Sequence, residues 1–179
     1  MKPIKLVCAG FGGQGVLSVG QMVALLAMKN NKEVSWMPSY GPEMRGGTAN
    51  CHVVVDDSPI AAPIIASGIT HLLAMNGPSL DKFLAKVAPG GTVIVNKAMI
   101  DHPLSRTDVK VIACDFPGLA EEAGAMKSQN MVAFGALIYA MEVFSKEDAK
   151  EVILEKFGGK KPELNEANLQ AFEFGYSKH

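Results

Sequence analysis

The chain has 179 residues and a formal net charge of −1, which suits a single domain and gives no electrostatic signal for nucleic-acid binding. Its composition, 48% hydrophobic and 20% charged, is typical of a globular protein that buries a full core. No uninterrupted apolar stretch approaches the roughly 18 residues that a membrane-spanning helix needs. We therefore expect neither a nucleic acid nor a membrane as partner, and we interpret the apolar N-terminal segment as a buried strand rather than a signal peptide.

The first third of the chain alternates short apolar runs with one helical pattern. Glycines, prolines and asparagines mark the boundaries between these segments. The pattern predicts strands at residues 4–9, 33–37 and 49–55, a helix at 13–28, and a loop at 39–47. Pro38 is expected to end the second strand, and residues 60–65 are expected to form an edge segment or a loop.

The remainder continues the alternation and predicts strands at residues 71–75, 92–95 and 109–113, with helices at 79–86, 117–123 and 131–144. Asn130 is expected to cap the last of these helices, and Ser145 the next. A hinge at residues 158–162 precedes a final helix at 163–176. The fold class is therefore α/β, with a three-layer, mostly parallel, doubly wound, Rossmann-like sheet and a C-terminal helical appendage. The expected organisation is one domain over residues 1–157, followed by the hinge and helix of residues 158–179.

The cysteines and histidines give no sign of a metal site. Cys8, Cys51 and Cys114 lie far apart in apolar runs and lack C-x-x-C spacing, so we expect no zinc ribbon or iron–sulfur cluster held by this chain alone. We interpret all three as small buried hydrophobes, reduced in a cytoplasm. No two of the four histidines have the spacing of metal ligands on one helix.

The segment GFGGQG, residues 10–15, fits the G-x-G-x-x-G pattern between the first strand and the first helix. Such a turn places backbone N–H groups and a helix N-terminus where an anion is favoured. A dinucleotide site also needs an acidic residue at the end of the second strand, and here Glu33 stands at its start. The sequence therefore favours a tight turn that faces an anion or a partner, and leaves a dinucleotide as the weaker alternative.

A second loop, SYGPEMRGG at residues 39–47, carries Tyr40, Glu43 and Arg45 beside Gly46 and Gly47. Its arginine can bind a carboxylate or phosphate through two N–H groups, with the glutamate as its pair. If the first two strands end as expected, both loops open on one edge of the sheet, where α/β folds place their sites. A self-contained salt bridge in a surface loop is the alternative. With no nucleophile elbow and no pair of carboxylates, we expect no catalytic residue.

Three segments together, CAGFGGQGVLSVGQMVA, PSYGPEMRGGTANCHVVV and NMVAFGAL, resemble the gamma subunit of 2-oxoacid:ferredoxin oxidoreductases. The resemblance spans roughly residues 4–145. The family it points to includes the 2-oxoglutarate, 2-oxoisovalerate and pyruvate enzymes. The combination of GGQG with PEMRGG carries it, and larger single-chain homologues contain the same domain fused to others.

The resemblance implies a non-autonomous subunit of a cytoplasmic, heteromeric enzyme, inactive alone. That enzyme decarboxylates a 2-oxoacid oxidatively with thiamine diphosphate, forms an acyl-CoA and passes electrons through iron–sulfur clusters to ferredoxin. The implied partners are alpha, beta and ferredoxin-like delta subunits, with a homodimer as the option for the isolated chain. None of the cofactors is expected to bind to this chain alone.

The residues that match the family motifs, and that the resemblance makes candidates for contacts with CoA or the active cleft, are Gly12, Gly13, Gln14, Gly15, Glu43, Arg45, Gly46, Gly47 and Asn130. Two alternatives stay open beside this function. One is a self-sufficient NAD(P)-dependent oxidoreductase, suggested by residues 10–15. The other is a CoA-binding or scaffold module without chemistry.

Overall fold

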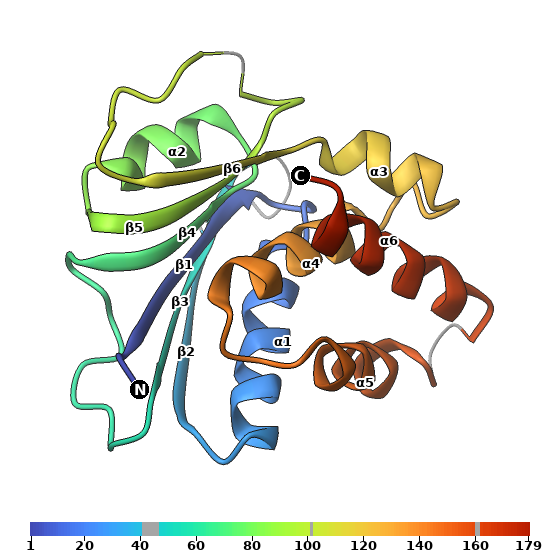
Figure 1. Cartoon of the computed structure of the whole chain (residues 1–179), viewed down its shortest axis with the longest axis horizontal. Helices are drawn as coiled ribbons and strands as arrows, with labels where there is room; N and C mark the ends of the chain where they lie inside the picture. The colour runs from blue at the N-terminus through green and yellow to red at the C-terminus, as the bar shows by residue number, and fades with distance from the viewer. Residues whose placement is uncertain (41–46, 101, 160–161) are drawn as a thin grey trace.

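The computed structural model of the chain describes residues 1–40, 47–100, 102–159 and 162–179. A six-stranded sheet lies between one helix on its first face and the remaining helices on its second (Figure 1). The helix on the first face is α2, Gly77–Leu84, which packs on β1, β4 and β5. The second face is covered by α1, Val16–Lys29, and α4, Gln129–Met141, so the expected three layers are confirmed.

The sheet has the strand order β2-β3-β1-β4-β5-β6. The strands are β1 Ile4–Phe11, β2 Glu33–Tyr40, β3 Thr48–Asp56, β4 Ile69–Ala74, β5 Val87–Asn96 and β6 Lys110–Cys114. β1, β4, β5 and β6 pair in parallel, whereas β3 runs antiparallel to both of its neighbours, β1 and β2. The expected mostly parallel α/β sheet is therefore confirmed, with one reversed strand between β2 and β1.

Two strands extend further than the sequence predicted. β2 continues through Pro38, which pairs with Cys51 of β3, because β2 lies at the edge of the sheet and a missing N–H on the outer side breaks no ladder bond. β5 begins at Val87, five residues before the predicted start at residue 92. Gly90 there has φ +76°, and the β4–β5 register shifts beside this segment.

The helix termini follow capping chemistry, with one correction. Ser145 caps α5, Lys146–Phe157, as predicted, by accepting a hydrogen bond from Asp148 N at 3.0 Å. Asn130 is not a cap, because α4 begins at Gln129, two residues earlier than predicted, and its N-cap is Ser128. A short helix, α3 Phe116–Glu122, precedes α4.

The C-terminal helix α6, Asn165–Ser177, packs along α4 after a short 3₁₀ turn at Pro162–Leu164. Glycines allow the two backbones to approach closely: a Cβ on Gly135 would overlap the backbone of Phe172, and one on Gly175 the backbone of Val132. The rings of Phe134 and Phe172 meet across this contact with centroids 5.6 Å apart. The last helix thus shares the core beneath the second face of the sheet. No helix in the described part of the chain is long and apolar enough to cross a membrane.

Candidate functional site

The first glycine loop meets Gly47, the last residue of the second, at the carboxyl edge of the sheet. β1 and β2 point the same way, although β3 lies between them, so both strands end at this edge. Gly12 N, just after β1, donates a hydrogen bond of 2.8 Å to Gly47 O, just before β3. The strands that precede the two loops thus end at one edge, while residues 41–46 of the second loop lie outside the described residues.

The first loop leads into α1 through Gly15, which has φ +78° and is the N-cap residue. The first helical hydrogen bond runs from Val19 N to Gly15 O at 3.1 Å, so the preceding N–H groups of the first turn have no partner within the helix. That turn has no acidic residue and no side-chain cap. The N-terminus of α1 therefore presents unneutralised partial positive charge to whatever lies in front of it.

A cavity of about 430 Å³ lies in front of this helix terminus. It is formed by the first glycine loop, the first turn of α1 and the start of β3, namely Phe11, Gly12, Gly13, Gly15, Val16, Leu17, Ser18, Gly47, Thr48 and Ala49. The surface of the cavity is mostly apolar, and its lining residues with polar side chains are Ser18 and Thr48. With the N-terminus of α1 at its wall it can accept an anionic group attached to an apolar body, and it offers neither a general base nor a strong nucleophile.

Gln14 braces the loop from inside the protein. Its Oε1 accepts hydrogen bonds from Phe11 N at 2.6 Å and from Asn76 Nδ2 at 3.0 Å. Its Nε2 lies 3.5 Å from Met75 O at the end of β4. The side-chain oxygen of Gln14 is thus occupied by the protein itself, and its role here is to hold the loop against β4.

Two asparagines that the sequence analysis missed complete this brace. Asn76 is fully buried and caps α2 by accepting from Ser79 N at 3.0 Å, while Asn96, also fully buried, donates to Met75 O at 3.4 Å. Asn76 was detectable, since an asparagine followed by a proline two residues later is a typical helix start. Asn96 carried no such signal, because only the parallel pairing of β4 with β5 brings it to Met75.

Asn130 lies against the first loop, as a shared site would require. A Cβ built on Gly15 would stand 2.7 Å from Asn130 Cβ, so the first turns of α1 and α4 touch at this point. The first turn of α4 also lacks an acidic residue. Two helix N-termini therefore face the same region, and their partial charges add.

The candidate site residues predicted from the sequence fall into two groups, those at this edge of the sheet and those outside the described residues. Gly12, Gly13, Gln14, Gly15, Gly47 and Asn130 lie together at this edge. Glu43, Arg45 and Gly46 fall outside the described residues. For Tyr40 only the backbone, as the last residue of β2, is described.

The cysteines lie in the core, and the Sγ of Cys51 donates to Val16 O of α1 at 3.6 Å. All three thiols are free and buried, as interpreted from the sequence. Burial raises the pKa of the Cys8 thiol well above its ordinary value and raises that of Cys114 to about 11. Both therefore stay protonated at neutral pH. Among the described residues, no group of three or more His, Cys, Asp and Glu side chains is arranged to hold a metal ion.

The geometry matches a known family. The family profile described as pyruvate ferredoxin/flavodoxin oxidoreductase matches residues 5–178. The chain belongs to this family. The resemblance to gamma subunits is confirmed, and the match extends through α6, beyond the motifs that suggested it.

Relatives within the family include standalone subunits and longer chains. The chain is 34% identical to the 2-oxoglutarate synthase subunit KorC of Methanocaldococcus jannaschii, covering 98% of this chain and 92% of that one. It is 33% identical to the ketoisovalerate oxidoreductase subunit VorA of Methanothermobacter marburgensis, covering 97% of this chain and 36% of the relative. The chain thus spans about a third of the VorA relative's length.

Solved structures show the same fold in both settings. The gamma subunit of a keto/oxoacid ferredoxin oxidoreductase from Geobacter sulfurreducens superposes with a TM-score of 0.83 at 28% identity, covering 98% of this chain and 97% of that one. A 2-oxoglutarate:ferredoxin oxidoreductase from Magnetococcus marinus, with 2-oxoglutarate, coenzyme A and succinyl-CoA bound, superposes with a TM-score of 0.87 at 27% identity. This chain corresponds to 30% of that one.

Proposed function

We propose that this chain is the non-autonomous gamma subunit of a cytoplasmic 2-oxoacid:ferredoxin oxidoreductase, and that its glycine-lined cavity receives an anionic group of coenzyme A. The complex would convert a 2-oxoacid to an acyl-CoA, with thiamine diphosphate and iron–sulfur clusters on other chains and ferredoxin as acceptor. Alpha, beta and delta chains would be its partners. The junction of two glycine loops before the α1 N-terminus carries the proposal.

Three observations support the assignment to CoA. The cavity is mostly apolar, but the N-terminus of α1 and the hydroxyl residues Ser18 and Thr48 lie at its wall, where a phosphate is favoured without a charged side chain. No carboxylate in the first turn of α1 or α4 competes with an incoming anion. CoA is also bound in the Magnetococcus marinus relative, whose chain contains a domain of this fold.

A reconstitution experiment tests the subunit role. The purified chain alone is expected to show no 2-oxoacid-dependent reduction of an electron acceptor. The same chain co-expressed with its alpha and beta partners is expected to support both that reduction and acyl-CoA formation. Robust activity from the isolated chain would overturn the proposal.

A charge placed in the first turn of α1 tests the anion site. Ser18→Asp adds a carboxylate at the cavity wall. The new charge interacts favourably with the dipole of α1, so the fold tolerates it, but it repels a bound phosphate. We expect the assembled complex carrying it to show a KM for CoA raised about tenfold or more, equivalent to about 1.4 kcal/mol, with a smaller change for the 2-oxoacid.

Ser18→Asn is the matched control, because it has nearly the same shape and no charge. Its KM for CoA should stay within about twofold of the wild type, a difference of less than ~0.5 kcal/mol. Equal effects of both variants, or an unchanged KM in the aspartate variant, would show that no anion binds in front of α1.

The geometry favours this function over a self-sufficient NAD(P) enzyme. In a dinucleotide fold the strand carrying the ribose-binding acid lies next to β1, whereas here β3 separates β2 from β1. Glu33 lies at the start of β2 and pairs with Asp56 at the far end of β3. Calorimetry with NAD(H) and NADP(H) should accordingly detect no micromolar binding to the chain.

A further inference from the structure

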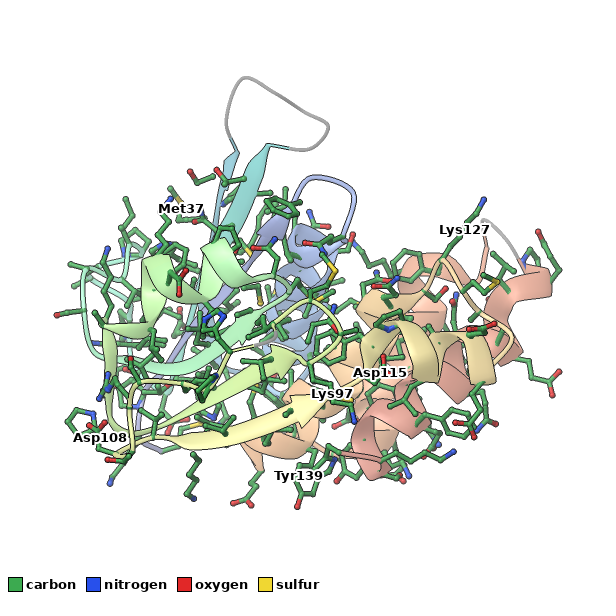
Figure 2. The ribbon with its side chains drawn as sticks, turned by 90° about the horizontal axis from the view of Figure 1, so that it is seen from above. Met37, Lys97, Asp108, Asp115, Lys127 and Tyr139 are labelled. Carbon is green, nitrogen blue, oxygen red and sulfur yellow. The ribbon has the colours of Figure 1, made fainter. Side chains whose placement is uncertain are left out.

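A second cavity, of about 470 Å³, opens on the other side of the sheet and shares no lining residue with the first. It lies between the end of β2, the start of β3, the C-terminal part of α2 and the segment around Ile65. In Figure 2 the labelled Met37 of β2, one of its lining residues, stands beside α2. The volume is within the range of small-molecule sites, and four separate segments form the walls.

The charge of this cavity is positive and unbalanced. Lys82 lies in the last turn of α2 and Lys86 two residues after the end of that helix, and their Nζ atoms lie 5.3 and 5.7 Å from the centroid of the same Phe83 ring. No carboxylate in the described part of the chain forms an ion pair with either lysine. Two ammonium groups held over one ring repel each other, and an anion between them would offset that repulsion.

His52 adds a neutral donor to the lining. Its Nδ1 accepts a hydrogen bond from Ile65 N at 2.9 Å, which assigns the ring proton to Nε2. Burial, and then the charges of Lys86 and Lys82, lower the pKa of His52, so the ring stays uncharged at neutral pH. The lining thus combines a neutral N–H donor with the two ammonium groups.

Asn50 adds a polar side chain to the lining. The residue is only 7% exposed and lies at the start of β3 in the wall of the cavity. Its amide supplies N–H groups that can donate to a phosphate or a carboxylate. Asn50 is therefore a further polar group in the wall of the cavity, beside the two lysines.

The remaining walls are apolar. Met37 is 41% and Ile64 63% exposed, and the Phe83 ring lies edge-on to His52 with centroids 6.3 Å apart. We propose that this cavity binds a small amphiphilic organic anion, whose phosphate or carboxylate lies between Lys82 and Lys86 and whose apolar body contacts Met37, Ile64 and Phe83. The site is independent of the proposed CoA contact, since the two cavities lie on different walls of the sheet.

Calorimetric titration of the full chain with phenyl phosphate tests the site. We expect saturable binding with a Kd below about 1 mM. The double variant Lys82→Gln/Lys86→Gln should weaken binding at least tenfold, and the matched pair Lys5→Gln/Lys110→Gln, which removes two exposed lysines outside this cavity, should leave it within twofold. The absence of saturable binding, or equal losses in both double variants, would overturn the proposal.

Three further ligands test separately the charged group and the apolar part of the proposed ligand. Phenylacetate in place of phenyl phosphate distinguishes a carboxylate from a phosphate ligand, according to which binds more tightly. Phenol, which lacks the charge, and inorganic phosphate, which lacks the ring, should each bind at least tenfold more weakly than the better of the two. If phenol binds as tightly as the better of the two, the ligand does not need a negative charge and the proposed anion site is wrong. If inorganic phosphate binds as tightly, the proposed contact of an apolar body with Met37, Ile64 and Phe83 is wrong.

Asn50→Leu tests the amide of the lining. Leucine has a similar size but cannot donate a hydrogen bond to the anion. The variant should lose at least fivefold in affinity for phenyl phosphate, and a cooperative melting transition shows that it is folded. Unchanged affinity in a folded Asn50→Leu protein would overturn the part of the proposal that places the anion against the start of β3.

Discussion

Gly15 is constrained twice, by its own backbone and by a neighbour. Its φ of +78° lies in the left-handed region, and Asn130 Cβ occupies the place that a Cβ would need. Gly13, two residues earlier, has φ +93° but open space around it. The pair thus separates the cost of backbone conformation from the cost of a steric clash.

Gly15→Ala should lower the free energy of unfolding by about 2–4 kcal/mol, since it adds a clash with α4 to the roughly 1–2 kcal/mol of left-handed strain. Gly13→Ala, the control, should cost only the strain. Urea denaturation of both variants measures the difference. Equal losses in the two proteins would contradict the close contact between the first turns of α1 and α4.

The side-chain oxygen of Gln14 forms its hydrogen bonds within the protein rather than with a ligand. Gln14→Met keeps the length of the side chain but leaves Phe11 N and the buried Asn76 amide without their acceptor, which should cost about 1–3 kcal/mol of unfolding free energy. Gln14→Glu retains an acceptor oxygen and should cost less. Chemical denaturation at pH 7 gives the comparison, and a methionine variant as stable as the wild type would show that the brace contributes nothing.

At the scale of elements, α4 and α6 depend on glycine at their crossing. The side of α4 away from the sheet meets α6 where neither backbone has room for a Cβ, and the fully buried Phe134 and Phe172 flank that contact. Tyr176 of α6 also lies edge-on to Tyr139 of α4 at a centroid distance of 5.7 Å. Small residues at a helix crossing therefore set the distance between these two elements.

Gly175→Ala should consequently destabilise the protein by about 3 kcal/mol or more, because the added methyl group meets the Val132 backbone, which cannot rotate away as a side chain would. Gly159→Ala, at an exposed glycine with nothing within 4 Å, should change stability by less than about 0.5 kcal/mol. Thermal melting distinguishes the two variants. A tolerated alanine at position 175 would argue against the close helix contact.

For the whole molecule, acid stability should depend on Asp57, which links the start of β2 to the chain terminus. Its carboxylate accepts from Lys32 Nζ at 2.6 Å and contacts the terminal ammonium of Met1. These contacts, with Lys32 foremost, lower the pKa of Asp57 from 3.8 to about 2. The ionised form is favoured in the folded protein, so its contribution is complete above pH ~4 and is lost as the pH falls toward 2.

The melting temperature of Asp57→Asn should therefore lie below that of the wild type at pH 5, and the gap should close between pH 4 and pH 2. Glu121→Gln, at an exposed carboxylate of α3, is the control and should show no comparable convergence. Melting curves in low-salt buffer, where surface charges are least screened, give the most sensitive measurement. A constant gap across this range would show that the ion pair adds nothing to folding.

The sequence by itself determined the α/β class, the alternation of elements, the ends of the first two strands at one edge and the family. Glycine punctuation, apolar periodicity and short motifs are all local signals. It did not reveal that β3 runs between β2 and β1, that Pro38 lies within an edge strand, or that Ser128 rather than Asn130 precedes α4. Nor did it reveal that Asn50, Asn76 and Asn96 are buried.

Only the tertiary structure decided which segments, distant in the sequence, lie side by side in the same contact or cavity. The Gln14–Asn76 brace, the Gly15–Asn130 contact and the cavity with Lys82 and Lys86 each join residues at least 30 positions apart. Strand pairing and helix packing create these neighbours, and no local propensity encodes them. Motifs that resemble a known family thus pointed to the family, whereas the placement of charges and polar groups, which decides what each cavity can bind, came from the packing of the sheet and its helices.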